Sequence, residues 1–193
     1  MRQVGTGNLP SIERAFKEYI RDANMMTSDI SYKLAASKVA GTIFSLDDVG
    51  QFAQGISGSR FSDKANYWTS GLFVSAAINK MATEMSSVVL EFGLLGCPVD
   101  CIGYALERGS IIVEGGAGDY LGERMRGGEI TVRGRVGNYA GYCMSGGRIT
   151  VRGDAGCHTG TYMSGGVIEV GGRISSIPES CSGTVIAGGR KIR

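Results

Sequence analysis

Residues 109–165 read GSIIVEGGAGDYLGERMRG, GEITVRGRVGNYAGYCMSG and GRITVRGDAGCHTGTYMSG, which is one 19-residue phrase written three times without insertion. An internal period of this length is typical of solenoid and array proteins. In each copy the third and fifth positions are apolar and β-branched, while their neighbours vary; the pairs are Ile111/Val113, Ile130/Val132 and Ile149/Val151. This alternation predicts a short strand with one buried face in every copy.

Glycines recur after each predicted strand, at Gly115, Gly118 and Gly122 in the first copy. Glycine permits a positive φ and close approach of one backbone to another. A methionine near the end of each copy suits irregular interior space, as its thioether is flexible. Because one copy cannot bury its apolar face alone, we expect equivalent residues to stack about 4.8 Å apart in neighbouring copies. The pattern therefore predicts a β-solenoid with one coil per copy.

Degenerate copies extend the repeat at both ends. Residues 166–172 open a fourth copy that ends two residues short, at Ser182, and residues 183–189 open a fifth. Upstream, an earlier coil is predicted over residues 90–108, where apolar residues and glycines fall in register: Phe92, Leu94, Gly96, Gly103 and Leu106. Atypical terminal repeats are what a solenoid needs as caps.

The run G-x-x-G-x-x-x-G behind an I-x-V strand resembles the GXGXG β-helix family. This family includes the C-terminal part of the glutamate synthase large subunit, one subunit of formylmethanofuran dehydrogenase, and stand-alone relatives. The matching residues are Gly115/Gly118/Gly122, Gly134/Gly137/Gly141 and Gly153/Gly156/Gly160. Residues 118–122 and 162–166 are most similar to the dehydrogenase subunit, and residues 170–177 to the end of the synthase domain. The resemblance covers roughly the C-terminal half and implies a right-handed coil.

The residues before this region follow a helical pattern. Ile12, Phe16 and Tyr19 share one face of a predicted helix that starts at Ser11, and a second helix is expected over residues 31–40. Ser45 is a suitable N-cap for a third helix, and Ser62 or Asp63 begins a longer one that reaches about Met85. We therefore expect a mainly β fold: an α-helical region over residues 1–86, then a right-handed parallel β-helix with 19-residue coils over residues 87–193.

Composition argues against several classes of partner. The net charge of the 193 residues is only +2, so no strong field attracts nucleic acid or a membrane surface. Residues 1–17 lack an apolar run of signal-peptide length, and the most apolar run, residues 71–78, is too short to cross a bilayer. These features predict a cytoplasmic protein without nucleic-acid or membrane partners.

No catalytic, cofactor-binding or metal-binding residue is predicted, and no cofactor. The five cysteines are an odd number, and the expected cytosolic setting favours free thiols. Cys97-x₃-Cys101 lacks the further ligands of a metal site. His158, the only histidine, occupies the repeat position of Tyr120 and Tyr139, so we expect it to extend an aromatic stack. Asp119 and Glu123 share one predicted corner, but the next coil replaces both acids.

Charged residues also share repeat positions in neighbouring coils. Arg135, Asp154 and Arg173 are expected to form a ladder of alternating sign, and Glu129 is expected to pair with Arg148. Arg133 and Arg152 share one repeat position, so two positive charges are expected to stack there. Together with Arg135 they are expected to form a small basic patch. Exposed pairs of this kind stabilise a fold by under about 1 kcal/mol each, so their main use is to fix register.

The resemblance implies a non-catalytic scaffold or subunit. Such a protein would position partner or catalytic subunits of an oxidoreductase complex against its β-helix wall, within a homo- or hetero-oligomer, as the GXGXG subunit of formylmethanofuran dehydrogenase does. The alternative is a glutamate synthase-related protein that takes part in nitrogen transfer, with a site between the helical half and the β-helix. In both cases we expect the helices either to cover the N-terminal end of the solenoid, burying Trp68 and Met81, or to pack against a second copy of the chain.

Overall fold

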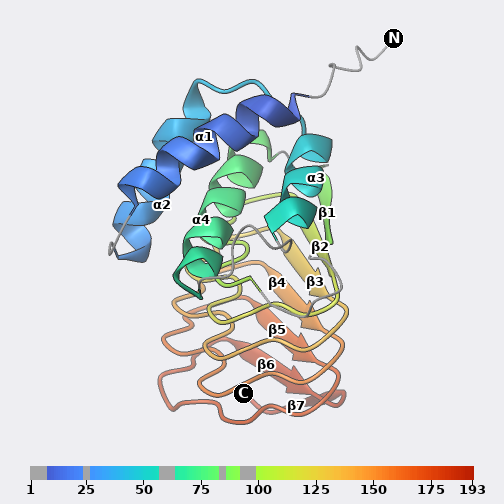
Figure 1. The fold of residues 1–193 in the computed structure, drawn as a ribbon. Coiled ribbons are helices and arrows are strands. Elements are labelled where there is room, and N and C mark those ends of the chain that lie inside the picture. The colour runs from blue at the N-terminus through green and yellow to red at the C-terminus, as the bar shows by residue number, and fades with distance from the viewer. Residues whose placement is uncertain (1–7, 24–26, 57–63, 83–85, 92–98) are drawn as a thin grey trace.

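The computed structural model describes residues 8–23, 27–56, 64–82, 86–91 and 99–193. Within these residues, four helices lie over one end of a parallel β-solenoid of about five turns, and the C-terminus lies at the other end (Figure 1). The described part of the chain forms one sheet, in which six strands run parallel in chain order and one antiparallel strand follows: β1 (Ser87–Glu91), β2 (Ser110–Glu114), β3 (Glu129–Val132), β4 (Arg148–Val151), β5 (Val167–Val170), β6 (Thr184–Ala187) and β7 (Arg190–Lys191).

The predicted stacking of equivalent residues is confirmed in the three central coils. Ile111 pairs with Ile130, Ile130 with Ile149 and Ile149 with Ile168, and each of these side chains is at most 1% exposed. The valines two residues further along pair in the same way. The three repeat methionines fill the opposite side of the interior, where all are buried: Met125, Met144 and Met163. The repeat is thus the unit of both sheet pairing and core packing.

The coils at the two ends differ in length from the central ones. Ser87 pairs with Ser110, so the first coil is longer than the repeat and its strand begins earlier than the repeat register predicts. Val88 and Leu90 still face the interior, because period-two alternation is compatible with this register as well. Of the predicted coil residues, Gly103 and Leu106 keep their repeat positions; Phe92, Leu94 and Gly96 lie outside the described residues.

The far end of the solenoid is closed by a short hairpin. Val167 pairs with Thr184, which confirms a fourth coil two residues shorter than the central ones. β7 then turns back antiparallel to β6 through Gly188 and Gly189, whose φ angles are 55° and 76°. A two-residue loop with two positive φ angles matches the twist of a hairpin. The last parallel strand therefore has a short, charged partner at its edge.

Polar side chains bridge successive coils at one corner. The Asp119 backbone N–H donates to Asp100 Oδ1 (2.8 Å), the Asn138 N–H to Asp119 Oδ1 (2.6 Å) and the Cys157 N–H to Asn138 Oδ1 (2.9 Å). Close packing at this corner explains Gly137, where an added Cβ would lie 2.8 Å from the Gly118 carbonyl carbon. These side-chain bonds add to the backbone hydrogen bonds that join successive coils at this corner.

The charge ladders are only partly as predicted. Arg148 forms its salt bridge with Glu169 (3.7 Å) rather than with Glu129. Asp154 accepts a hydrogen bond from the Arg173 backbone N–H (2.7 Å), so its carboxylate joins the coils through the main chain and not through an arginine side chain. A backbone donor is already fixed in position by the solenoid, whereas an arginine side chain loses rotamer freedom on pairing.

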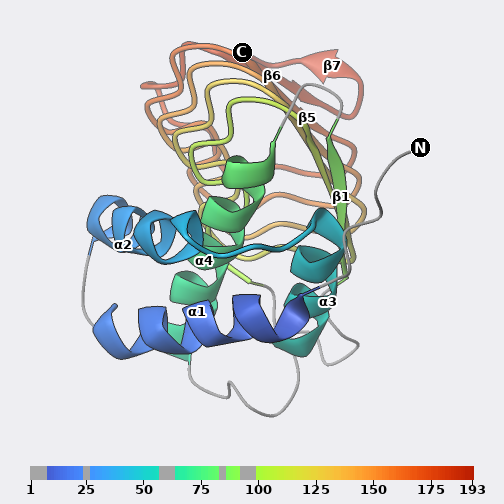
Figure 2. The same cartoon turned by 90° about the horizontal axis from the view of Figure 1, so that it is seen from above.

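The four helices form the helical cap: α1 (Leu9–Asp22), α2 (Ser28–Ala40), α3 (Leu46–Ile56) and α4 (Lys64–Met81). Figure 2 shows them spread over the end of the solenoid. α4 packs directly on the first coil, where a Cβ on Gly71 would lie 1.7 Å from the Asp100 carbonyl oxygen. Ser75 Oγ donates to the Cys101 carbonyl (2.9 Å) and accepts from the Gly103 N–H (3.0 Å). The helices therefore cover the first coil, as one of the two predicted arrangements requires.

Side-chain caps hold the ends of two helices. The predicted N-cap of α3 is confirmed: Ser45 Oγ accepts from the Asp48 N–H (3.2 Å), and Asp48 in turn accepts from the Ser45 N–H (2.7 Å). Lys80 Nζ donates to three carbonyls at the C-terminus of α2, those of Val39, Ala40 and Thr42, at 2.6–3.0 Å. Trp68 and Met81, expected to be buried, are only half-buried at the edge of the cap.

Candidate functional site

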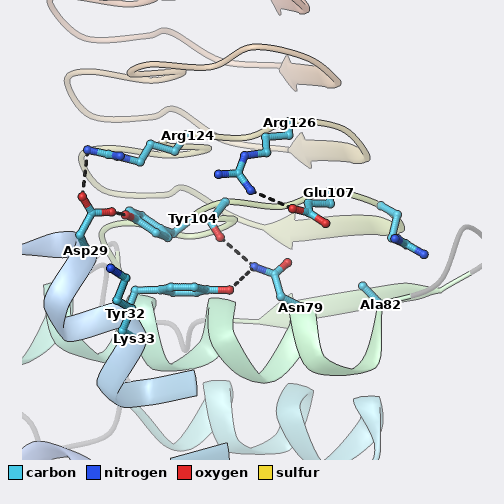
Figure 3. Close-up of a pocket in the computed structure, with 11 residues that line it drawn as sticks. Asp29, Tyr32, Lys33, Asn79, Ala82, Tyr104, Glu107, Arg124 and Arg126 are labelled. Carbon is cyan, nitrogen blue, oxygen red and sulfur yellow. Dashed lines mark hydrogen bonds and ion pairs between the residues drawn. The ribbon is translucent and has the colours of Figure 1, made fainter. Parts of the chain in front are cut away.

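A pocket of about 420 Å³ lies at the junction between the helical cap and the first two coils (Figure 3). We call it the junction pocket. Both halves of the chain contribute to its lining: Asp29, Tyr32, Lys33, Asn79 and Ala82 come from the helical half, and Tyr104, Ala105, Glu107, Arg108, Arg124 and Arg126 from the coils. A volume of this order is within the range of small-molecule sites.

Helical and coil periodicity bring these residues together. Asp29, Tyr32 and Lys33 are spaced three and four residues apart, so they share one face of α2. Glu107 and Arg126 stack at equivalent positions of consecutive coils, where they are joined by a 2.9 Å salt bridge. Because α4 lies directly on the first coil, its last turn places Asn79 beside Tyr104 (Figure 3).

One wall of the junction pocket is a hydrogen-bonded chain from the cap to the second coil. The Tyr104 hydroxyl donates to Asp29 Oδ1, and Arg124 Nη2 lies 3.1 Å from Asp29 Oδ2. Burial and the bond to Asp29 raise the pKa of Tyr104 well above its ordinary value, which keeps the phenol protonated as a donor. Asp29 therefore ties α2 to two successive coils.

The floor of the pocket is built on an aromatic pair and an amide. The rings of Tyr32 and Tyr104 lie 4.7 Å apart between centroids. Asn79 Nδ2 donates to the Tyr32 hydroxyl (2.8 Å) and to the Tyr104 carbonyl (2.9 Å). Both amide protons are thus engaged within the protein, and Asn79 offers only its carbonyl oxygen to a ligand.

The lining carries an excess of positive charge. Four cationic side chains, those of Lys33, Arg108, Arg124 and Arg126, face two acids. Asp29 and Glu107 pair with Arg124 and Arg126, whereas Lys33 and Arg108 form no salt bridge within the part of the chain that the structure describes. The lining therefore offers fixed cationic groups to an anionic ligand.

A buried acid lies next to the pocket wall. Glu123 is 4% exposed and accepts a hydrogen bond from Ser28 Oγ (3.3 Å), with Cys101 Sγ 4.0 Å away. Burial raises the pKa of Glu123 above its ordinary value, against the lowering effects of Ser28 and Arg124. Burial also raises the pKa of the Cys101 thiol, and the nearby acids add to that shift, so this cysteine is an unreactive neutral group.

The other residues considered from sequence lie away from the junction pocket. His158 stacks on Tyr139, which stacks on Tyr120, with 4.9 Å between successive ring centroids, as predicted. Asp119 accepts an inter-coil hydrogen bond, so Asp119 and Glu123 do not act as a pair. The four described cysteines are free thiols; Cys97 lies outside the described residues, and no cluster of three metal-ligating side chains occurs among those that are described.

One flank of the solenoid carries five aromatic rings, of which two are exposed and three are half-buried. The stack of Tyr120, Tyr139 and His158 is joined by Tyr142 and Tyr162, whose rings meet edge to face at 5.9 Å. We call these five residues the aromatic flank. Four of the eight tyrosines of the chain lie here, and Tyr162 is 61% exposed. The rings cover each other's faces, which leaves edges and hydroxyl groups for contact with other molecules.

Comparison with protein-family models, curated proteins and solved structures gives no match to this chain. No helix among the described residues is long and apolar enough to cross a bilayer. The junction pocket and the aromatic flank are therefore the two features of the molecule that bear on its function.

The sequence led only to the alternative of a site between the helical half and the β-helix, and none of the residues of the junction pocket was predicted as part of it. The signal that could have revealed it is a break in the repeat: Arg124 and Arg126 correspond to Cys143 and Ser145 one coil later. An arginine pair that occurs in only one coil is not required for stacking. Its partners on the helices carried no comparable signal, because Asp29 was assigned to a break before the helix expected over residues 31–40, although α2 begins at Ser28, and Asn79 is an ordinary polar position of a helix.

Proposed function

We propose that this protein is a non-catalytic scaffold subunit that binds a partner protein subunit through the aromatic flank. The supporting observation is the exposure of Tyr162 together with the clustering of Tyr139, Tyr142 and His158 beside it. Tyrosine is over-represented among the residues that dominate protein–protein binding, because it combines a large apolar ring with a hydrogen-bonding group.

The solenoid itself does not require these rings at the surface. The positions equivalent to Tyr142 are Glu123 and Thr161, and those equivalent to Tyr162 are Arg124 and Cys143. Side chains that vary between coils while the interior stays constant are expected to serve contacts outside the coil. The stacked backbone supports the flank rigidly, so little side-chain freedom is lost when a partner binds. We further propose that the coils are right-handed, as crossovers between parallel strands almost always are.

The test is co-purification of the tagged full chain from its native host, with native mass spectrometry of the eluted complex. The variant Tyr142→Ser/Tyr162→Ser is compared with Arg133→Ser/Arg152→Ser, which removes two exposed side chains that follow β3 and β4. We expect a defined hetero-complex with the wild type and the arginine variant, and its loss with the tyrosine variant at unchanged circular dichroism. A complex retained equally by both variants would contradict docking on the aromatic flank.

A second candidate function is nitrogen transfer in a glutamate synthase-related reaction, with the site between the helical half and the solenoid. The observation that favours it is the junction pocket, which lies at that place. The two functions predict different complexes after purification. A homo-oligomer that transfers nitrogen without another subunit supports the second candidate, whereas activity found only with a co-purified catalytic subunit supports the scaffold.

A further inference from the structure

The arginines of the junction pocket are not explained by the solenoid. At the positions of Arg124 and Arg126, the two following coils carry Cys143 and Ser145, then Tyr162 and Ser164. At the first of these positions the backbone has the same conformation in each coil, with φ near +55° at 124, 143 and 162. The guanidinium groups are therefore specific to the coil that faces the helical cap.

Arg108 stands at a repeat position that the later coils fill with glycine. In those coils a side chain is crowded, since a Cβ on Gly127 would lie 2.2 Å from the Glu107 carbonyl oxygen of the preceding coil. In the first coil the side chain of Arg108 is exposed. The end of the solenoid thus provides one more position for a cation beside the pocket than the repeat allows elsewhere.

Fixed guanidinium groups retain donors for a ligand. The salt bridge of Arg126 to Glu107 uses Nη1, and that of Arg124 to Asp29 uses Nη2. A guanidinium carries five N–H donors in a planar fork that matches carboxylate and phosphate oxygens. The acids therefore orient these arginines without neutralising the pocket, where Lys33 and Arg108 supply the excess positive charge.

We propose that the junction pocket binds a small ligand through an oxyanion group, a carboxylate or a phosphate, held by Arg126, with Lys33 and Arg108 adding positive charge on either side of it. The Tyr32/Tyr104 pair and the carbonyl oxygen of Asn79 contact the rest of the ligand, which takes up the remaining part of the 420 Å³ cavity. This inference is independent of the docking function, because the aromatic flank and the pocket lining share no residue.

The test is isothermal titration calorimetry of the full chain with two probes, inorganic phosphate and malonate, at constant ionic strength. The pocket variant Arg108→Gln/Arg126→Gln is matched by the control Arg133→Gln/Arg152→Gln. Each variant removes two exposed arginines, one with a salt bridge to an acid of the preceding coil (Glu107 or Glu114) and one without a salt bridge among the described residues. The two variants therefore have the same net charge and a similar loss of surface pairing.

We expect wild type and control to bind a probe with equal affinity, and the pocket variant to bind it at least about tenfold more weakly, since hydrogen bonds to charged groups are lost. Binding of malonate alone identifies a carboxylate site, binding of phosphate alone a phosphate site, and binding of both a general oxyanion site; each supports the proposal. Binding of neither probe to the wild type would overturn it. Equal weakening in pocket and control variants would also overturn it, because that result reflects overall charge.

Discussion

Gly141 provides a quantitative test of how the coils pack. Its φ is +70°, and a Cβ added there would lie 2.4 Å from Ile168 Cδ1. Ile168 is fully buried within the isoleucine stack, so its side chain cannot move aside without displacing its neighbours. Gly141→Ala therefore adds two costs: a non-glycine residue in the left-handed region, about 1–2 kcal/mol, and overpacking of the core, about 1–3 kcal/mol.

The smaller entropy of the unfolded alanine chain offsets about 0.4–1 kcal/mol of this cost. We expect a net loss of roughly 2–4 kcal/mol, which corresponds to a fall in Tm of roughly 4–16 °C for a chain of this length. Gly189→Ala is the matched control, because its φ is +76° and nothing lies within 4 Å of the added Cβ. The control should show only the backbone cost.

A second substitution separates the steric cost from the backbone cost. Ile168→Val removes the Cδ1 atom that meets the new Cβ. In the wild type it should cost about 0.5–1.5 kcal/mol, as for other buried isoleucines. In the Gly141→Ala background it should be neutral or stabilising, so that urea unfolding gives a coupling free energy of about 1 kcal/mol or more. Additive effects of the two substitutions, or equal losses in Gly141→Ala and Gly189→Ala, would refute the packing argument.

Three further predictions concern charge and thiol groups. Glu123→Gln should be more stable than the wild type at pH 7, because the raised pKa of Glu123 makes wild-type stability fall as pH rises from 4.5 through the folded-state pKa. In melts at different pH values, the difference in stability between the variant and the wild type should therefore disappear near pH 4.5. A difference that is absent at every pH would mean that Glu123 is solvated. Lys80→Met should lower the free energy of unfolding by about 1–3 kcal/mol, because three carbonyl acceptors at the end of α2 lose a charged donor. The control Lys17→Met, at an exposed position, should change it by less than about 0.5 kcal/mol, and equal effects would show that the bonds of Lys80 do not stabilise the end of α2. Thiol counting in denaturant without reductant should give five free thiols, with exposed Cys157 reacting first in the native protein, and a count of three or one would contradict the expectation of free cysteines.

The solenoid could be predicted from sequence because its determinants are local and repeated. The alternation around Ile130 and Ile149 defines both the strand and its buried face, and the constant spacing of the copies defines which residues pair. The first coil escaped this reasoning. Val88 and Leu90 alternate as any strand would, and the longer register of this coil depends on how it packs against the cap, which no local pattern records.

The residues of the junction pocket could not be predicted, although a site between the two halves was one alternative, because they come from segments far apart in the chain. Asp29, Asn79 and Arg124 come from two helices and a coil, and their proximity depends on the docking of α2 and α4 on the solenoid. The same holds for Glu123, which is buried and accepts a hydrogen bond from Ser28 at the start of α2, a contact between residues 95 positions apart. The repeat pattern predicts the residues that all coils share, whereas the pocket is lined by side chains that occur in one coil only.

The most direct test of the scaffold function is site-specific photo-crosslinking in the native host. A photoreactive amino acid replaces Tyr162 on the aromatic flank or, as the control, Arg152 after β4, and the products are identified by mass spectrometry. We predict one dominant product at position 162, a crosslink to a partner subunit, and no crosslink to that subunit at position 152. No crosslink at position 162, or the same products at both positions, would contradict the account.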